Sequence, residues 1–85
     1  MITKKITVGI PTGLEARPVA MLVQVASQYE SSIYIESGLT KVNAKSIMGM
    51  MTLGIDKGAD VLVTADGQDE ERAVAAIEQY LSNAS

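Results

Sequence analysis

Cysteine and histidine are both absent from this 85-residue sequence. Without cysteine the chain forms no disulfide and offers no thiolate ligand. Without histidine it lacks the commonest metal ligand and the usual general base. We therefore expect neither a metal site nor a cofactor. Phenylalanine and tryptophan are absent too, so the core must be aliphatic, with methionine filling irregular gaps.

Charge and hydropathy exclude two classes of partner. The formal net charge is −3, and Lys4-Lys5 is the one basic pair, which is not a nucleic-acid footprint. No apolar run approaches the length of a membrane span. Residues 1–6 lack the hydrophobic region of a signal peptide. We expect a cytoplasmic protein that neither binds nucleic acid directly nor inserts into a membrane.

Hydrophobic periodicity predicts one α+β domain over residues 1–85, in the order βαββαβα. Strands are expected over 5–10, 33–36, 40–43 and 61–66. Helices are expected from about 16 to 28, over 46–53 and over 69–81. The hairpin between the second and third strands requires antiparallel pairing, which favours an open-faced two-layer sandwich with helices on one face of the sheet. The side chains expected to face the helices are Ile6, Val8, Ile33, Ile35, Val61 and Val63.

The stretch from Thr12 to Pro18 reads as a turn that leads into the first helix. Arg17 places a permanently charged donor fork at a helix start, where an anion is favoured, but Glu15 already supplies a negative charge there. The alternative is a structural role only: Glu15 as an acid in the first helical turn and Arg17 as a solvated surface charge. Behind them, Val19, Leu22, Val23 and Ala26 form a core face. A second, small or polar row is available for docking: Ala16, Ala20, Gln24 and Ser27.

A second special stretch begins at Ser46, a good N-cap for a short helix. A phosphate on Ser46 would meet free helical N–H groups, with Lys45 adding positive charge beside it. Ile47, Met48 and Met51 lie at helical spacing, and Met50 and Leu53 can serve the core instead. A helix this short cannot turn both sets inward, so we expect part of this methionine-rich surface to be exposed. The alternatives are that all of them are core residues and that Ser46 is only a cap.

Together these two stretches resemble motifs of one protein family. Gly13–Pro18 resembles the Gly-Leu-His-Ala-Arg-Pro motif of HPr, the small phosphocarrier of the bacterial sugar phosphotransferase system. Lys41–Gly49 is similar to the regulatory serine motif of HPr proteins from Gram-positive bacteria. The resemblance extends from Ile6 to Leu81. It implies a four-stranded antiparallel sheet in the order 1-4-2-3 with three helices on one face.

The resemblance also implies a function. The family's phosphoacceptor histidine falls at Glu15, so the chain is similar to Crh (catabolite repression HPr), a branch that lacks this histidine and keeps the serine. We then expect a regulatory protein and not an enzyme, phosphorylated at Ser46 by HPr kinase/phosphorylase and bound by a CcpA-type repressor. Enzyme I and enzyme IIA surfaces are possible partners without phosphotransfer. The alternative is an HPr phosphocarrier altered at Glu15, naturally or as an engineered phosphohistidine mimic. The expected partner-binding residues are Thr12, Ala16, Arg17, Ala20, Gln24, Ser27, Ile47, Met48 and Met51.

Overall fold

Strands and helices alternate along the chain in the expected order. The computed structural model describes residues 1–9, 16–53 and 58–82. A fraying tail is predicted for residues 83–85, which lie outside these ranges. The elements are β1 (Ile2–Thr7), α1 (Ala16–Ser27), β2 (Ser32–Ser37), β3 (Thr40–Asn43), α2 (Ile47–Met51), β4 (Asp60–Asp66) and α3 (Glu70–Ser82).

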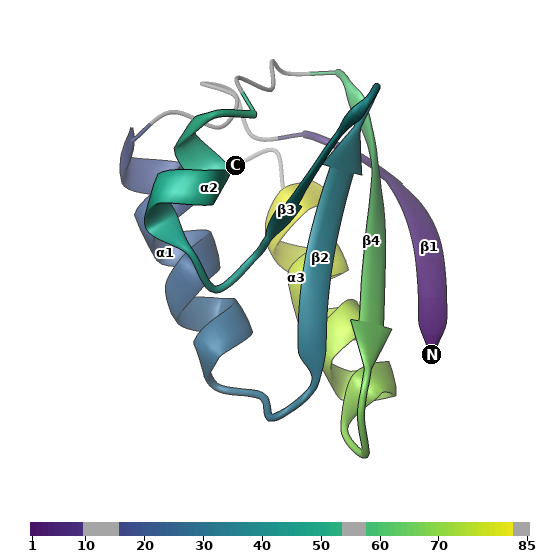
Figure 1. Cartoon of the computed structure of the whole chain (residues 1–85). Coiled ribbons are helices and arrows are strands. Elements are labelled where there is room, and N and C mark those ends of the chain that lie inside the picture. The colour runs from purple at the N-terminus through teal and green to yellow at the C-terminus, as the bar shows by residue number, and fades with distance from the viewer. Residues whose placement is uncertain (10–15, 54–57, 83–85) are drawn as a thin grey trace.

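The four strands form one antiparallel sheet in the order β1-β4-β2-β3 (Figure 1). β4 lies between β1 and β2, with Ile6 opposite Val61 on one side and Ile35 opposite Val63 on the other. β2 and β3 form the predicted hairpin, whose turn requires the positive φ of 59° at Gly38. The predicted sheet type and strand order are both confirmed.

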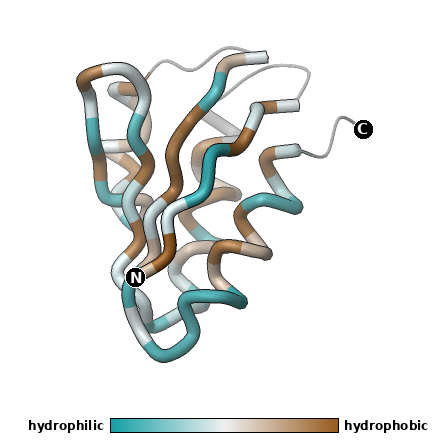
Figure 2. Tube along the Cα trace, turned by 90° about the vertical axis from the view of Figure 1, so that its right-hand side faces the viewer, coloured by the Kyte–Doolittle hydropathy of each residue, from teal (hydrophilic) through white to brown (hydrophobic). Residues whose placement is uncertain are grey.

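All three helices cover the same face of the sheet, and the core lies between the two layers (Figure 2). The six strand residues predicted to face the helices are buried, as are the four predicted core residues of α1. From α3 the core receives Ala73, Val74, Ile77 and Leu81, while Tyr80 is half-buried. The opposite face of the sheet carries polar side chains such as Thr3 and Thr64, whose hydroxyls lie 3.2 Å apart. The open-faced sandwich is therefore confirmed.

Two elements, β1 and α2, differ from their predicted bounds by two or more residues. β1 spans Ile2–Thr7. It begins earlier than predicted because its first residues pair with β4 as far as Ala65, a contact that local alternation does not reveal. Val8 has left the ladder, although its N–H still donates to the carbonyl of Ala59 at 2.8 Å and its side chain is buried. α2 ends at Met51 because Thr52 caps it, with its N–H and its hydroxyl both donating to the carbonyl of Gly49.

Candidate functional site

Ser46 is the N-cap of α2, as predicted. Its backbone is extended, with φ −109° and ψ 112°, and its hydroxyl oxygen accepts a hydrogen bond from the N–H of Gly49 at 3.2 Å. Its carbonyl accepts the first helical bond, from Met50, at 2.9 Å. The side chain is partly exposed. The hydroxyl is thus held over the first turn of a helix, where backbone N–H groups lack intrahelical partners and negative charge is favoured.

The end of β3 fixes the position of Ser46. The carbonyl of Asn43 accepts a bond from the Ser46 N–H at 3.0 Å, and its side-chain oxygen accepts one from the Lys45 N–H at 2.8 Å. Between them, Ala44 is fully buried and its N–H donates to the carbonyl of Ile33 at 2.9 Å. The connection from β3 to α2 is therefore held by hydrogen bonds to the sheet as well as by the cap of α2, so the position of Ser46 does not depend on α2 alone.

Lys45 differs from its expected role as charge support beside Ser46. Its ammonium donates to the carbonyl of Tyr29, just beyond the end of α1, at 2.7 Å. A cation at this position satisfies a carbonyl just past the end of the helix and lies near the negative end of the helix dipole. The bond links the end of α1 to the start of α2. No local sequence signal reveals it, because the two residues are 16 positions apart.

The exposed face of α2 is apolar. Met50 is fully buried, whereas Met48 is 80%, Met51 54% and Ile47 46% exposed. Leu53 packs against the core, and the expected exposure of part of this methionine-rich surface is confirmed. Met48 and Met51 are three residues apart, which places them on neighbouring positions of one helix surface. We call Ile47, Met48 and Met51 the α2 face.

α1 packs against α2 and carries the other expected docking residues (Figure 1). Ala20 is half-buried, and Gln24 and Ser27 are exposed. Met21 on the same helix is 47% exposed, a large apolar residue that the sequence reasoning did not name although it falls outside the core spacing. Ala16 and Arg17 belong to the first turn of α1, but the structure does not describe their side chains. Thr12 and Glu15 lie outside the described residues.

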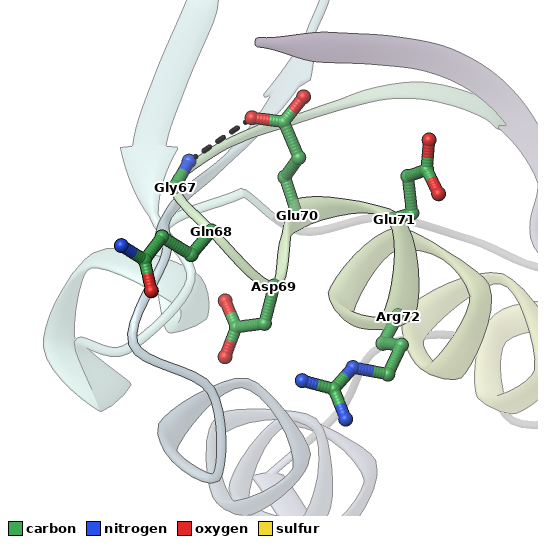
Figure 3. A pocket seen from close by; sticks show the side chains of 6 residues that line it. All are labelled: Gly67, Gln68, Asp69, Glu70, Glu71 and Arg72. Carbon is green, nitrogen blue, oxygen red and sulfur yellow. Dashed lines mark hydrogen bonds between the residues drawn. The ribbon is translucent and has the colours of Figure 1, made fainter.

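A separate hollow lies at the start of α3, lined by Gly67, Gln68, Asp69, Glu70, Glu71 and Arg72 (Figure 3). The Asp69 carboxylate accepts bonds from the N–H groups of Glu30 and Ser31 and from the Ser31 hydroxyl. These bonds, led by the Ser31 hydroxyl, lower the pKa of Asp69.

Glu70 accepts a bond from the Gly67 N–H at 3.1 Å and contacts the Met1 ammonium at 3.0 Å. The Gly67 bond, with the Met1 ammonium next, lowers the pKa of Glu70. Both acids thus hold segments of the fold together.

Within the described ranges, no group of three or more acidic side chains could hold a metal ion. Across the same residues, no helix is both long and apolar enough to span a bilayer.

Comparison with known proteins identifies the family to which this fold and sequence belong. The family model for the "PTS HPr component phosphorylation site" matches residues 2–83. The chain belongs to the HPr family. The HPr-like protein Crh of Bacillus subtilis (strain 168) is 42% identical over 81 residues, which are 95% of each chain. Crh of Halalkalibacterium halodurans is 43% identical over 81 residues, 95% of this chain and 96% of the relative.

A solved structure agrees with the sequence relatives. The crystal structure of the phosphocarrier protein HPr from Bacillus anthracis str. Ames superposes with a TM-score of 0.92 at 41% identity, covering 94% of this chain and 95% of that one. The chain is therefore a Crh-like member of the HPr family, a regulatory or phosphocarrier protein of the phosphotransferase system and not an enzyme. Within this HPr fold, Ser46 caps the same short helix that carries the α2 face.

Proposed function

We propose that this protein is a cytoplasmic regulator of carbon catabolite control, switched by phosphorylation of Ser46. HPr kinase/phosphorylase transfers a phosphoryl group from ATP to the Ser46 hydroxyl. The phosphorylated form then binds a CcpA-type repressor. The observation that carries the proposal is the placement of a partly exposed serine hydroxyl at the N-cap of α2, next to an exposed apolar helix face.

The geometry favours a phosphate without refolding. A phosphoryl group adds about −1.5 to −2 charges and three acceptor oxygens. On Ser46 the phosphoryl group would be attached to Oγ, the atom that already accepts a hydrogen bond from the Gly49 N–H. The helix start favours this charge, so the backbone stays as it is and the surface changes from neutral to dianionic. A partner with arginine or lysine beside an apolar pocket gains new charge-assisted bonds at that point.

The α2 face supplies the apolar half of the same docking surface. Methionine side chains adapt to differently shaped partners because they are unbranched and polarizable. Ala20, Gln24 and Ser27 on α1 extend the surface, and we include Thr12, Ala16 and Arg17 among the partner-binding residues. The same surface could be touched by enzyme I or enzyme IIA domains without phosphotransfer.

A direct binding assay tests the proposal. The protein is treated with HPr kinase/phosphorylase and ATP, checked for stoichiometric phosphate on Ser46 by mass spectrometry, and titrated into the CcpA-type repressor of the source genome. We expect binding by the phosphorylated form and a much weaker signal from the untreated protein. Ser32→Ala, at an exposed serine on the sheet, is the matched control and should be phosphorylated and bound normally. Equal binding with and without phosphate refutes the switch.

A further inference from the structure

Two of the three residues of the α2 face carry a sulfur atom. Cysteine is absent, so the five methionines carry all the sulfur atoms. Three of them follow closely in α2 at positions 48, 50 and 51. Met48 and Met51 are 80% and 54% exposed, whereas Met50 between them is fully buried. Accessible and protected thioethers therefore alternate within a single helix.

We propose that Met48 and Met51 form a reversible oxidation site that turns off docking at the α2 face. This inference rests on the proposed function of that face. The reagent class is peroxide. The peroxide O–O bond breaks and one oxygen is transferred to the thioether sulfur, so an S–O bond forms. The sulfur loses two electrons, and hydrogen peroxide is reduced to water.

Oxidation changes the property on which docking depends. A thioether is apolar and flexible, whereas a sulfoxide is polar and carries a strong acceptor oxygen. On the free protein that oxygen faces water, so the fold is unaffected. Against an apolar partner surface it loses its bonds to water without replacement, which makes binding less favourable. Because Met48 and Met51 make up two of the three residues of the α2 face, their oxidation changes most of it.

Met50 gives the proposal an internal control. Its side chain is in the hydrophobic core, so peroxide reaches it only when the fold opens. Met1 is 78% and Met21 on α1 47% exposed, so both should be oxidised along with the α2 face. The expected order of oxidation follows burial and not sequence position.

The experiment begins with the phosphorylated protein, so that the kinase step cannot be affected. Graded hydrogen peroxide is added, and peptide mapping by mass spectrometry locates the sulfoxides. We expect Met48 and Met51 to be oxidised while Met50 stays reduced and the circular dichroism spectrum is unchanged. Affinity for the CcpA-type repressor should fall about tenfold or more. Methionine sulfoxide reductases supplied with a dithiol should restore it, because the sulfoxide oxygen leaves as water while the dithiol is oxidised to a disulfide.

Three results overturn the proposal: oxidation of Met50 at the same rate, unchanged affinity after full oxidation of Met48 and Met51, or no recovery after reduction. The double variant Met48→Leu/Met51→Leu is compared only with its own untreated form. Its affinity should not respond to peroxide, and an equal loss would place the effect at Met21 or elsewhere. If the untreated phosphorylated protein does not bind the repressor at all, the proposed function fails and the regulatory role of oxidation fails with it. The peptide map still decides separately whether the two methionines are the oxidation site.

Discussion

Replacing Ser46 by alanine should destabilise the protein as well as remove the phosphate acceptor. The hydroxyl accepts the Gly49 N–H, and alanine leaves that donor without its acceptor. Loss of a serine N-cap costs typically about 1 kcal/mol, within a range of about 0.5–2. The bond here is 3.2 Å long and only partly buried, which favours a cost of about 0.5–1 kcal/mol.

Thermal unfolding measures this cost. For a domain of this size about 1 kcal/mol corresponds to a shift of roughly 4–8 °C in Tm, so Ser46→Ala should lower Tm by roughly 2–8 °C. Ser46→Asp keeps an acceptor at the N-cap and should melt close to the wild type, since aspartate and serine are similar caps. Scanning calorimetry on the three proteins is sufficient. If Ser46→Ala melts with the wild type, or if Ser46→Asp loses as much as Ser46→Ala, the capping argument is wrong.

Three further predictions concern other parts of the chain. Gly67→Ala would place a Cβ 2.7 Å from the Ser31 Cα and should lower the free energy of unfolding in urea by about 1–3 kcal/mol. In Gly49→Ala the new Cβ meets nothing closer than 3.5 Å, so the free energy of unfolding should rise by about 0.5–1 kcal/mol. Changes of the opposite sign would contradict the packing described. Because the pKa of Asp69 is lowered in the folded protein, its carboxylate stabilises the fold above its unfolded pKa of about 3.9, and this stability is lost as pH falls toward the folded pKa. The Tm of Asp69→Asn should therefore decline less between neutral and acid pH than the Tm of the wild type. Parallel declines of the two Tm values would refute this. Glu15→His should allow labelling from phosphoenolpyruvate through enzyme I where the parent chain shows none, and label on the parent would support the phosphocarrier alternative.

The fold was largely predictable because local and tertiary signals agree. Alternating strands, the turn at Gly38 and the capping serine each fix one element from a few neighbouring residues. Partial exposure of the α2 methionines followed from helix length, since a short helix cannot turn every side chain inward, whereas the burial of Met50 and the exposure of Met48 came from the structure. The order of the strands came from the family resemblance and not from periodicity.

The parts that sequence reasoning missed depend on residues far apart in the chain. β1 starts early because Ile2 pairs with Ala65, and Lys45 is drawn to the Tyr29 carbonyl. The bonds from Ser31 to Asp69 span 38 positions. Such contacts form only when distant segments of the chain come together, so no local pattern of charge or hydropathy contains them.

The proposed switch is tested most directly by mapping the phosphate from two donors on the same protein. One sample receives HPr kinase/phosphorylase with ATP, and the other receives enzyme I with phosphoenolpyruvate. Peptide mass spectrometry then locates the phosphate in each sample, with Ser46→Ala as the control in both. We predict complete modification of Ser46 in the first sample and none anywhere in the second. An unmodified Ser46 in the first sample, or an enzyme-I-dependent phosphate in the second, contradicts a regulator switched at Ser46.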